Sequence, residues 1–335
     1  MSFWKESPGP HWSDWISSLF SCSGVSLAQP IRRNPLALTT YAESVTYSLA
    51  KSTEASTIVD FLSEHFKITQ NAKCCLPVER LARGLQSDWI MVLAKNEGKI
   101  VGVVASRFLG SLMFQTLIES ELKQSKYSSA DYIDFFCIHP DYRKTGIGSD
   151  LLKSIDFYSS ERGRPIHFFQ KEIIPLSSIP PIWYGSYVVR QIILGNTTNP
   201  RISLSQHQLK RKIQPEFTIS FANPRASQDS RYYVNDCGNF KIHLAITNTY
   251  HIFQNAWLGE VLFYSVEDAD EEIPLKNIAA AIEEIIEIAG YQYILMDESI
   301  PHLKQFNWTR DASYFIYIYN SNPRKFFSVK PLLWF

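Results

Sequence analysis

The stretch Asp131–Leu152, DYIDFFCIHPDYRKTGIGSDLL, decides how this sequence is interpreted. The apolar run Tyr132–Ile138, interrupted by one acid, predicts a buried strand. The following ten residues, 139–148, contain two glycines and two basic residues and predict a loop. A helix is predicted over Ser149–Ser159, because apolar residues recur there at helical spacing on one face. The segment therefore reads as a strand, a basic glycine-containing loop and a helix.

This loop has the properties of an anion-binding site. Gly146 and Gly148 allow positive φ angles and close backbone approach, so consecutive main-chain N–H groups can point at one ligand. The helix N-terminus adds a partial positive charge, and Arg143 and Lys144 add full charges. A pyrophosphate is the ligand expected at such a loop. Taken alone, the loop is equally compatible with a plain connection whose glycines only make the turn.

Further elements are predicted on both sides of this segment. Upstream we expect two helices and a strand hairpin, over Glu54–Phe66, Pro77–Leu85, Trp89–Ala94 and Lys99–Arg107, and downstream a strand over Pro165–Ile174. After a polar stretch at 195–230, similar elements recur, over Asn239–Asn248, Ala256–Val266, Leu275–Ile288, Tyr291–Met296, His302–Phe306 and Tyr314–Tyr319. The first, second, fourth and last of these are predicted strands. Leu275–Ile288 is a predicted helix, and His302–Phe306 is a predicted short helix. Two copies of one α+β unit is the economical interpretation.

Composition narrows the class of protein. The chain has 335 residues and equal numbers of basic and acidic side chains, 33 each. That length is enough for two domains of ~150 residues, and the zero net charge argues against a protein whose main partner is nucleic acid. No apolar run of ~18 residues predicts a membrane span. The five cysteines lack metal-ligand spacing, and no signal peptide is recognised. We expect a cytoplasmic protein without a metal.

Strand and loop together resemble the GNAT superfamily of acyl-coenzyme A N-acyltransferases. Arg143, Gly146 and Gly148 match its Arg/Gln-x-x-Gly-x-Gly/Ala signature. The segment Ile133–His139, IDFFCIH, resembles the Ile-Asn-Phe-Leu-Cys-Val-His signature of the N-myristoyltransferase family. The resemblance continues in order along nearly the whole chain, at Phe3-Trp4, Ile31–Leu38, Lys99–Gly102, Ile173–Pro175, Trp183-Tyr184, Leu295-Met296 and Tyr317–Asn320.

The fold that this resemblance implies is α+β. It consists of two tandem GNAT-like units that share a mixed, mostly antiparallel sheet, with the second unit shortened. We expect an extended N-terminal arm over residues 1–50 and a first unit over 51–200 that binds acyl-coenzyme A. A second unit over 201–335 is expected to carry the acceptor side and the C-terminal tail.

The activity that the resemblance implies is transfer of a fatty acyl group, such as myristoyl, from acyl-coenzyme A directly to an N-terminal glycine amine. The acceptor partner would be a peptide or protein N-terminus. Main-chain N–H groups of Phe135 and Phe136, splayed by a bulge, would form the oxyanion hole. The carboxylate of Phe335 would take the amine proton. The residues that would hold the coenzyme are Phe3, Trp4, Ile138, Arg143, Lys144, Thr145, Gly146, Ile147, Gly148 and Ser149.

The acceptor features match the family less well than the coenzyme features. Asp134 stands where the family has Asn, and Arg310 and Ala312 replace the glycines of a Gly-Asp-Gly segment. Two alternatives therefore stay open: a GNAT acetyltransferase that acts on another amine, and a catalytically inactive member of the fold, including a viral structural protein. His139 is expected to cap or pack rather than act as a base. Cys137 is expected to be a small buried residue rather than an acyl carrier.

Overall fold

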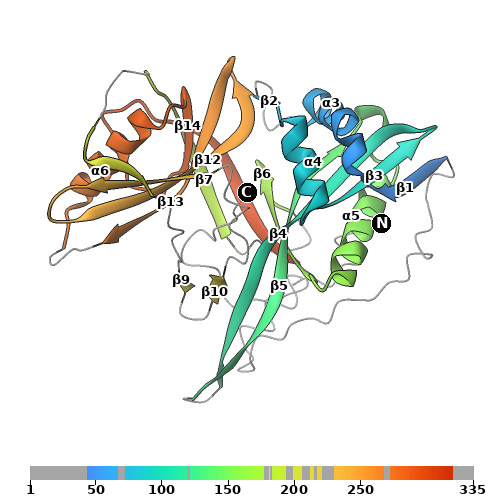
Figure 1. Ribbon diagram of the computed structural model, residues 1–335, viewed down its shortest axis with the longest axis horizontal. Coiled ribbons are helices and arrows are strands. Elements are labelled where there is room, and N and C mark those ends of the chain that lie inside the picture. Colours follow the sequence, from blue (N-terminus) through green and yellow to red (C-terminus); the bar gives the residue numbers. More distant parts are fainter. Residues whose placement is uncertain are drawn as a thin grey trace. The chain divides into compact units, whose positions relative to one another are not determined.

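The computed structural model describes residues 44–66, 72–118, 121–176, 181, 183–193, 199–205, 212–214, 217–220, 230–267 and 272–319 (Figure 1). These residues form two compact units. The first contains the described residues up to 183 together with 212–214, 217–220 and 315–319, and the second contains the others from 184 to 314. Each unit is a sheet with helices, which confirms the α+β class.

The sheet of the first unit contains the strand hairpin predicted from the sequence. Its strands run in the order β1 (Val45–Leu49), β3 (Ile90–Asn96), β4 (Lys99–Ile118), β5 (Glu121–Ile138) and β6 (Ile166–Glu172). Neighbours are antiparallel except β5 and β6, which are parallel. Two short strands, β9 (Lys212–Gln214) and β10 (Phe217–Ser220), extend from β4. The pairing of β4 with β5 continues to Ile118 and Glu121, far beyond the ends predicted for these strands.

Helices of the first unit lie on both faces of this sheet (Figure 1). They are η2 (Ser52–Glu54), α3 (Ala55–His65), α4 (Val78–Gln86), η3 (Pro140–Tyr142) and α5 (Ile147–Glu161), and a short strand, β2 (Ala72–Cys74), lies between α3 and α4 in the sequence. Ser106 of β4 contacts Ser159 of α5, whereas its neighbour Arg107 lies over the Trp89 ring. This alternation follows from the two-residue period of a strand.

The buried face of α5 is the one that the sequence predicted. Ile147, Leu151 and Ile155 are almost fully buried and pack against apolar residues of β1, β3 and β4. Burial of each such side chain contributes ~1.5–3 kcal/mol. This packing holds the start of α5, with the loop before it, at the end of β5.

A buried polar network ties the far end of α5 to the sheet. Ser159 Oγ donates to Ser106 Oγ at 3.0 Å, and Ser106 Oγ donates to the fully buried carboxylate of Asp131. Arg164 Nη1 lies 3.6 Å from the second oxygen of Asp131. Burial raises the pKa of Asp131, and contacts with His167, Ser106 and Arg164 oppose that rise. Because buried polar groups are costly to leave unpaired, this network specifies the position of α5 on β4 and β5.

The sheet of the second unit repeats the same connection. Its strands run in the order β7 (Trp183–Gln191), β14 (Tyr293–Asp297), β13 (Ala256–Glu267), β12 (Lys241–Phe253), β11 (Ser230–Asp236) and β8 (Ile202–Ser205). β13 and β14 are parallel and are joined by α6 (Leu275–Ile288), whose bounds agree with the prediction. The same strand–helix–parallel-strand order joins β5, α5 and β6, which confirms the tandem organisation. The residues of the last strand, β15 (Thr309–Tyr319), are divided between the units.

One predicted element is wrong. No helix forms over His302–Phe306, where the chain makes a single turn with a hydrogen bond from Phe306 N to Leu303 O. The main-chain N–H of Leu303 donates instead to the buried Glu283 carboxylate at 3.3 Å. The Leu303 N–H would have no intrahelical partner in a helix that begins at His302, so this tertiary contact satisfies it and holds the turn against Glu283. The strands β2, β7, β8, β9, β10 and β11 were not predicted, and the predicted domain bounds stay predictions.

Candidate functional site

The strand β5 contains the bulge expected at the centre of the site. Opposite β4, the register passes from Cys137 paired with Val103 directly to Asp134 paired with Ala105, so Phe135 and Phe136 together oppose one residue. Phe135 has a left-handed backbone with φ of 48°. A non-glycine residue in this conformation costs about 1–2 kcal/mol, and such strain concentrates at functional sites. The bulge points to a specialised position in an otherwise regular strand.

The two phenylalanines of the bulge have different surroundings. The Phe135 ring is buried and lies 5.7 Å from the Phe66 ring and 5.8 Å from the Trp89 ring. Phe136 is 42% exposed, and its ring is close to the start of α5. A Cβ atom placed on Gly148 would lie 3.2 Å from the Phe136 ring and 2.9 Å from Ile138 Cδ1. The bulge and the glycine loop are therefore in direct contact.

The loop after β5 brings its backbone into an unusual conformation. Gly146 is the N-cap of α5 and has φ of 97°, and Lys144 has φ of 65°. Thr145 Oγ1 donates to Tyr142 O at 2.7 Å, which closes the turn. The positive φ expected of the glycines is confirmed for Gly146, whereas Gly148 serves through close packing on Ile138 and Phe136.

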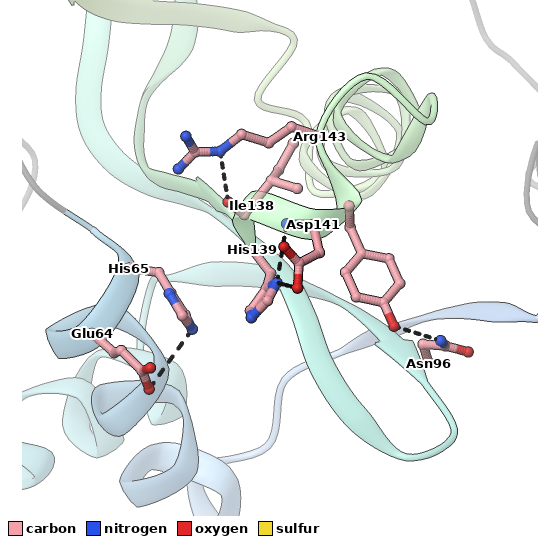
Figure 2. A network of polar contacts seen from close by, with 8 residues as sticks. Glu64, His65, Asn96, Ile138, His139, Asp141 and Arg143 are labelled. Atoms are coloured by element: carbon pink, nitrogen blue, oxygen red, sulfur yellow. Dashed lines mark hydrogen bonds and ion pairs between the residues drawn. The ribbon is translucent and has the colours of Figure 1, made fainter.

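Anion binding is favoured by the electrostatics of this loop. Within the described part of the chain, no side chain caps the N-terminus of α5, so its first amides rely on other partners. The side chains of Arg143, Lys144 and Thr145 are exposed at the loop, whereas Ile147 is buried and contributes only its main chain. Arg143 Nε donates to Ile138 O at 3.2 Å, and Figure 2 shows this side chain turned back along the loop. Ser149 lies in the first turn of α5.

His139 has a structural role in this loop. Its Nδ1 atom accepts a hydrogen bond from the Asp141 main-chain N–H at 3.3 Å, which caps η3. The His139 ring stands edge-on to the His65 ring of α3, with centroids 4.6 Å apart (Figure 2). Nearby, Asn96 Nδ2 donates to the Tyr142 hydroxyl at 2.7 Å and joins the loop to the β3 end. The expectation that His139 caps and packs is confirmed.

Cys137 lies two residues after Phe135 and is buried. Burial raises the pKa of its thiol to about 12, although Arg143 opposes the rise. A thiol with that pKa is protonated at neutral pH and is a poor nucleophile. The surroundings agree with a packed residue and not with an acyl carrier.

If the protein transfers acyl groups as the resemblance implies, we expect Cys137→Ala to stay within about threefold of the unaltered protein, because a buried, protonated thiol is a poor nucleophile. Because burial keeps the Cys137 thiol protonated near neutral pH, iodoacetamide should spare it in the folded protein. Peptide mass spectrometry after labelling, with Cys75 as the more exposed comparison, measures this directly. Rapid native labelling of Cys137, together with loss of transfer in the variant, would contradict the expectation.

Several residues of the site were not predicted. Asp134 Oδ1 accepts the Phe135 main-chain N–H at 2.7 Å, and the other Asp134 oxygen forms an ion pair with Arg107. Arg107 ends the predicted strand of β4, and a charged residue in an otherwise apolar strand was the available signal. Phe66 and Trp89 offered no such signal, because aromatic residues are common in any core.

Three predicted site residues, Phe3, Trp4 and Phe335, lie outside the described residues. The roles assigned to the other site residues stay predictions. In the second unit, Arg310 is exposed and donates to Ser186 Oγ at 2.5 Å, and its Nε lies 4.0 Å from Glu298. Within the described ranges, no group of three or more His, Cys, Asp or Glu side chains is placed to hold a metal ion. No helix in these ranges is long and apolar enough to cross a membrane.

Comparisons with known proteins identify the fold. Residues 59–167 match the model of the acetyltransferase (GNAT) family. Two crystal structures of Saccharomyces cerevisiae N-myristoyltransferase with bound myristoyl-CoA align over 96% of this chain at 13% identity. Their TM-scores are 0.61 and 0.64, and 93% and 88% of the yeast chains are covered. A third, with myristoyl-CoA and inhibitors, has a TM-score of 0.63, 14% identity and 90% coverage. No curated protein matches the sequence.

The segment that matches the GNAT family model, residues 59–167, lies within the first unit. Over nearly its whole length, the chain has the fold of N-myristoyltransferase. The resemblance based on IDFFCIH is thereby confirmed at the level of the fold, and so are the tandem GNAT-like units. An identity of 13–14% defines a shared fold and does not carry the yeast enzyme's substrate over to this chain.

Proposed function

We propose that this protein is an N-acyltransferase that moves a fatty acyl group from acyl-coenzyme A to an N-terminal glycine amine. The observation that carries the proposal is the contact between the strained bulge at Phe135 and Phe136 and the glycine loop at the start of α5. The bulge suits an oxyanion that develops on a thioester, and the glycine loop suits a pyrophosphate. Acyl-coenzyme A contains both a thioester and a pyrophosphate. The N-myristoyltransferase fold supports the same choice.

The glycine loop would hold the coenzyme by its pyrophosphate. Gly146 is left-handed and precedes α5, and no side chain of the described residues caps this helix end. The main-chain N–H groups of the first turn are therefore suited to bind an anion. The exposed side chains of Arg143, Lys144 and Thr145 would add charge and hydrogen bonds at its rim. Phe3 and Trp4 would cover the nucleotide end, as the resemblance implies.

The bulge would stabilise the charge that grows on the thioester oxygen. The amine nitrogen bonds to the carbonyl carbon, the C–S bond breaks, and coenzyme A leaves as a thiol after gaining a proton. A preorganised N–H donor at the oxygen is worth about 3 kcal/mol. Phe136 would supply the first donor, because the Phe135 N–H donates to Asp134. The Phe135 N–H would be a second donor only if the acyl oxygen displaced the Asp134 carboxylate from it.

The acceptor amine must lose a proton before it can attack. Its usual pKa of about 7.7–8.0 leaves it largely protonated at neutral pH, so a nearby base is required. We assign this role to the carboxylate of Phe335, following the family resemblance. The Cys137 thiol and the capping imidazole of His139 are not needed for it.

A second candidate function is acetyl transfer to another amine. The observation that favours it is the match of residues 59–167 to a family of acetyltransferases. The Phe135 ring is also buried between Phe66 and Trp89 beside the bulge, which suits a short acyl group better than a long one.

A chain-length series separates these functions. The protein is incubated with acetyl-, octanoyl- and myristoyl-coenzyme A and a peptide that begins with glycine, and the acylated peptide is measured by mass spectrometry. The same peptide with an N-acetylated glycine is the control. Transfer that rises with chain length is expected. Preference for acetyl-coenzyme A would favour the second candidate, and binding without any transfer would favour an inactive member of the fold.

A further inference from the structure

Asp134 lies directly before the bulge and makes two different contacts. Its Oδ1 atom accepts the main-chain N–H of the next residue, Phe135, at 2.7 Å. Its Oδ2 atom is ion-paired with Arg107 of β4. The Arg107 side chain is 9% exposed and that of Asp134 is 20% exposed, so water screens the pair only weakly.

Arg107 is itself held by aromatic rings. Its guanidinium carbon lies 5.2 Å from the Trp89 ring centroid, 5.7 Å from that of Tyr132 and 5.6 Å from that of Phe135. Cation–π contacts of this kind fix the plane and position of a guanidinium. Arg107 therefore presents a rigid partner to the Asp134 carboxylate.

The carboxylate acts on the residue whose backbone is strained. Phe135 has its left-handed φ of 48° in the arrangement in which its N–H reaches Asp134. This charge-assisted hydrogen bond fixes the plane of the 134–135 peptide group. Because pairing with β4 holds the strand on both sides of the bulge, that plane sets ψ of Asp134 and φ of Phe135 together. The conformation of Phe135 in turn sets the direction of the peptide group that carries the Phe136 N–H.

We propose that Asp134 and Arg107 are positioning residues, which hold Phe135 left-handed and thereby orient the Phe136 N–H toward the acyl oxygen. This inference rests on the proposed acyl transfer. Neither side chain touches the reacting atoms. An aspartate serves here because its second oxygen can bind Arg107 while the first holds the amide.

Kinetics of Asp134 variants test the inference. Asp134→Ala should lower kcat about tenfold or more, with KM for acyl-coenzyme A changed less than about twofold, since the phosphate loop is untouched. Asp134→Asn keeps an oxygen that accepts the Phe135 N–H and should restore most of kcat. Arg107→Met should lower kcat in the same direction, and the Asp134→Ala/Arg107→Met double variant should be no slower than the slower single variant.

Arg164→Met is the matched control. Arg164 also stacks on a ring, that of Phe108 at 4.4 Å, and lies 3.6 Å from the buried Asp131, but it does not contact the bulge. The Arg164→Met variant should be less stable than the unaltered protein but should keep its kcat. Unchanged or increased kcat in Asp134→Ala would overturn the inference, and an increase would indicate that the carboxylate competes with the acyl oxygen.

A second measurement does not depend on turnover. Hydrogen–deuterium exchange in peptides that contain Phe135 should be faster in Asp134→Ala than in the unaltered protein, and slower again in Asp134→Asn. If the unaltered protein transfers no acyl group, the proposed function fails, and the exchange result still decides the positioning role. Equal exchange in all three proteins would overturn it.

Discussion

Replacing Gly146 by valine should weaken coenzyme A binding at least about tenfold, which corresponds to 1.4 kcal/mol. Gly146 has φ of 97° at the N-cap of α5, and a β-branched residue is strongly disfavoured there. Relief of the strain rotates the peptide groups that begin the helix and turns their N–H groups away from a pyrophosphate. Isothermal titration calorimetry with coenzyme A measures the change.

Gly163→Val is the matched control for this variant. Gly163 follows the end of α5 with φ of 73°, and a Cβ atom there would meet nothing within 4 Å. The Gly163→Val variant should lower the midpoint of thermal unfolding about as much as Gly146→Val does. It should leave coenzyme A binding unchanged. Equal binding by the two variants would remove the loop from the coenzyme site. Failure of the unaltered protein to bind coenzyme A would contradict the proposed function itself.

Replacing Glu283 by alanine should lower the free energy of unfolding by about 3–5 kcal/mol. The Glu283 carboxylate is buried in the second unit, where it accepts from Trp308 Nε1 at 2.9 Å and is ion-paired with Arg190. The Arg190 guanidinium lies 3.8 Å from the Phe306 ring centroid. Truncation leaves the half-buried Trp308 indole N–H without this acceptor and leaves Arg190 to the partly exposed carboxylate of Glu287. Urea denaturation monitored by tryptophan fluorescence measures the loss.

Glu287 provides the comparison. It also approaches Arg190, at 3.5 Å, but its side chain is 41% exposed. Glu287→Ala should therefore cost less than about 1 kcal/mol. The double variant Glu283→Leu/Arg190→Met should recover much of the lost stability, because it removes both buried charges together. Similar losses in Glu283→Ala and Glu287→Ala would show that burial is not the controlling factor.

The elements on which the site is built were predictable. The strand before the loop, the helix after it and the buried face of α5 follow from apolar spacing, and the left-handed Gly146 follows from the conformational freedom of glycine. The α6 helix was found with its correct bounds for the same reason. These features depend on residues a few positions apart, whose preferences agree with one another.

Other parts of the fold could not be predicted in this way. The predicted helix at His302–Phe306 is absent, and the segment is held instead by Glu283, twenty residues upstream of Leu303, which accepts the Leu303 N–H and the Trp308 indole N–H. The β5 side of the β4–β5 hairpin extends beyond its predicted start, because its polar residues 121–130, ELKQSKYSSA, lack the apolar pattern of a strand and pair with β4. In both cases contacts between segments, and not a local pattern, decided the outcome.

The amino-acid sequence determined the order of strand, glycine loop and helix, and with it the N-myristoyltransferase-like fold, because periodicity and backbone freedom are local properties. Only the tertiary structure decided what surrounds the bulge. Arg107 reaches Asp134 through the register of β4 against β5, and Phe66 and Trp89 reach Phe135 from separate elements. A slip of one residue in that register would send Arg107 to the opposite face of the sheet, so long-range pairing, and not composition, brings Arg107 to Asp134.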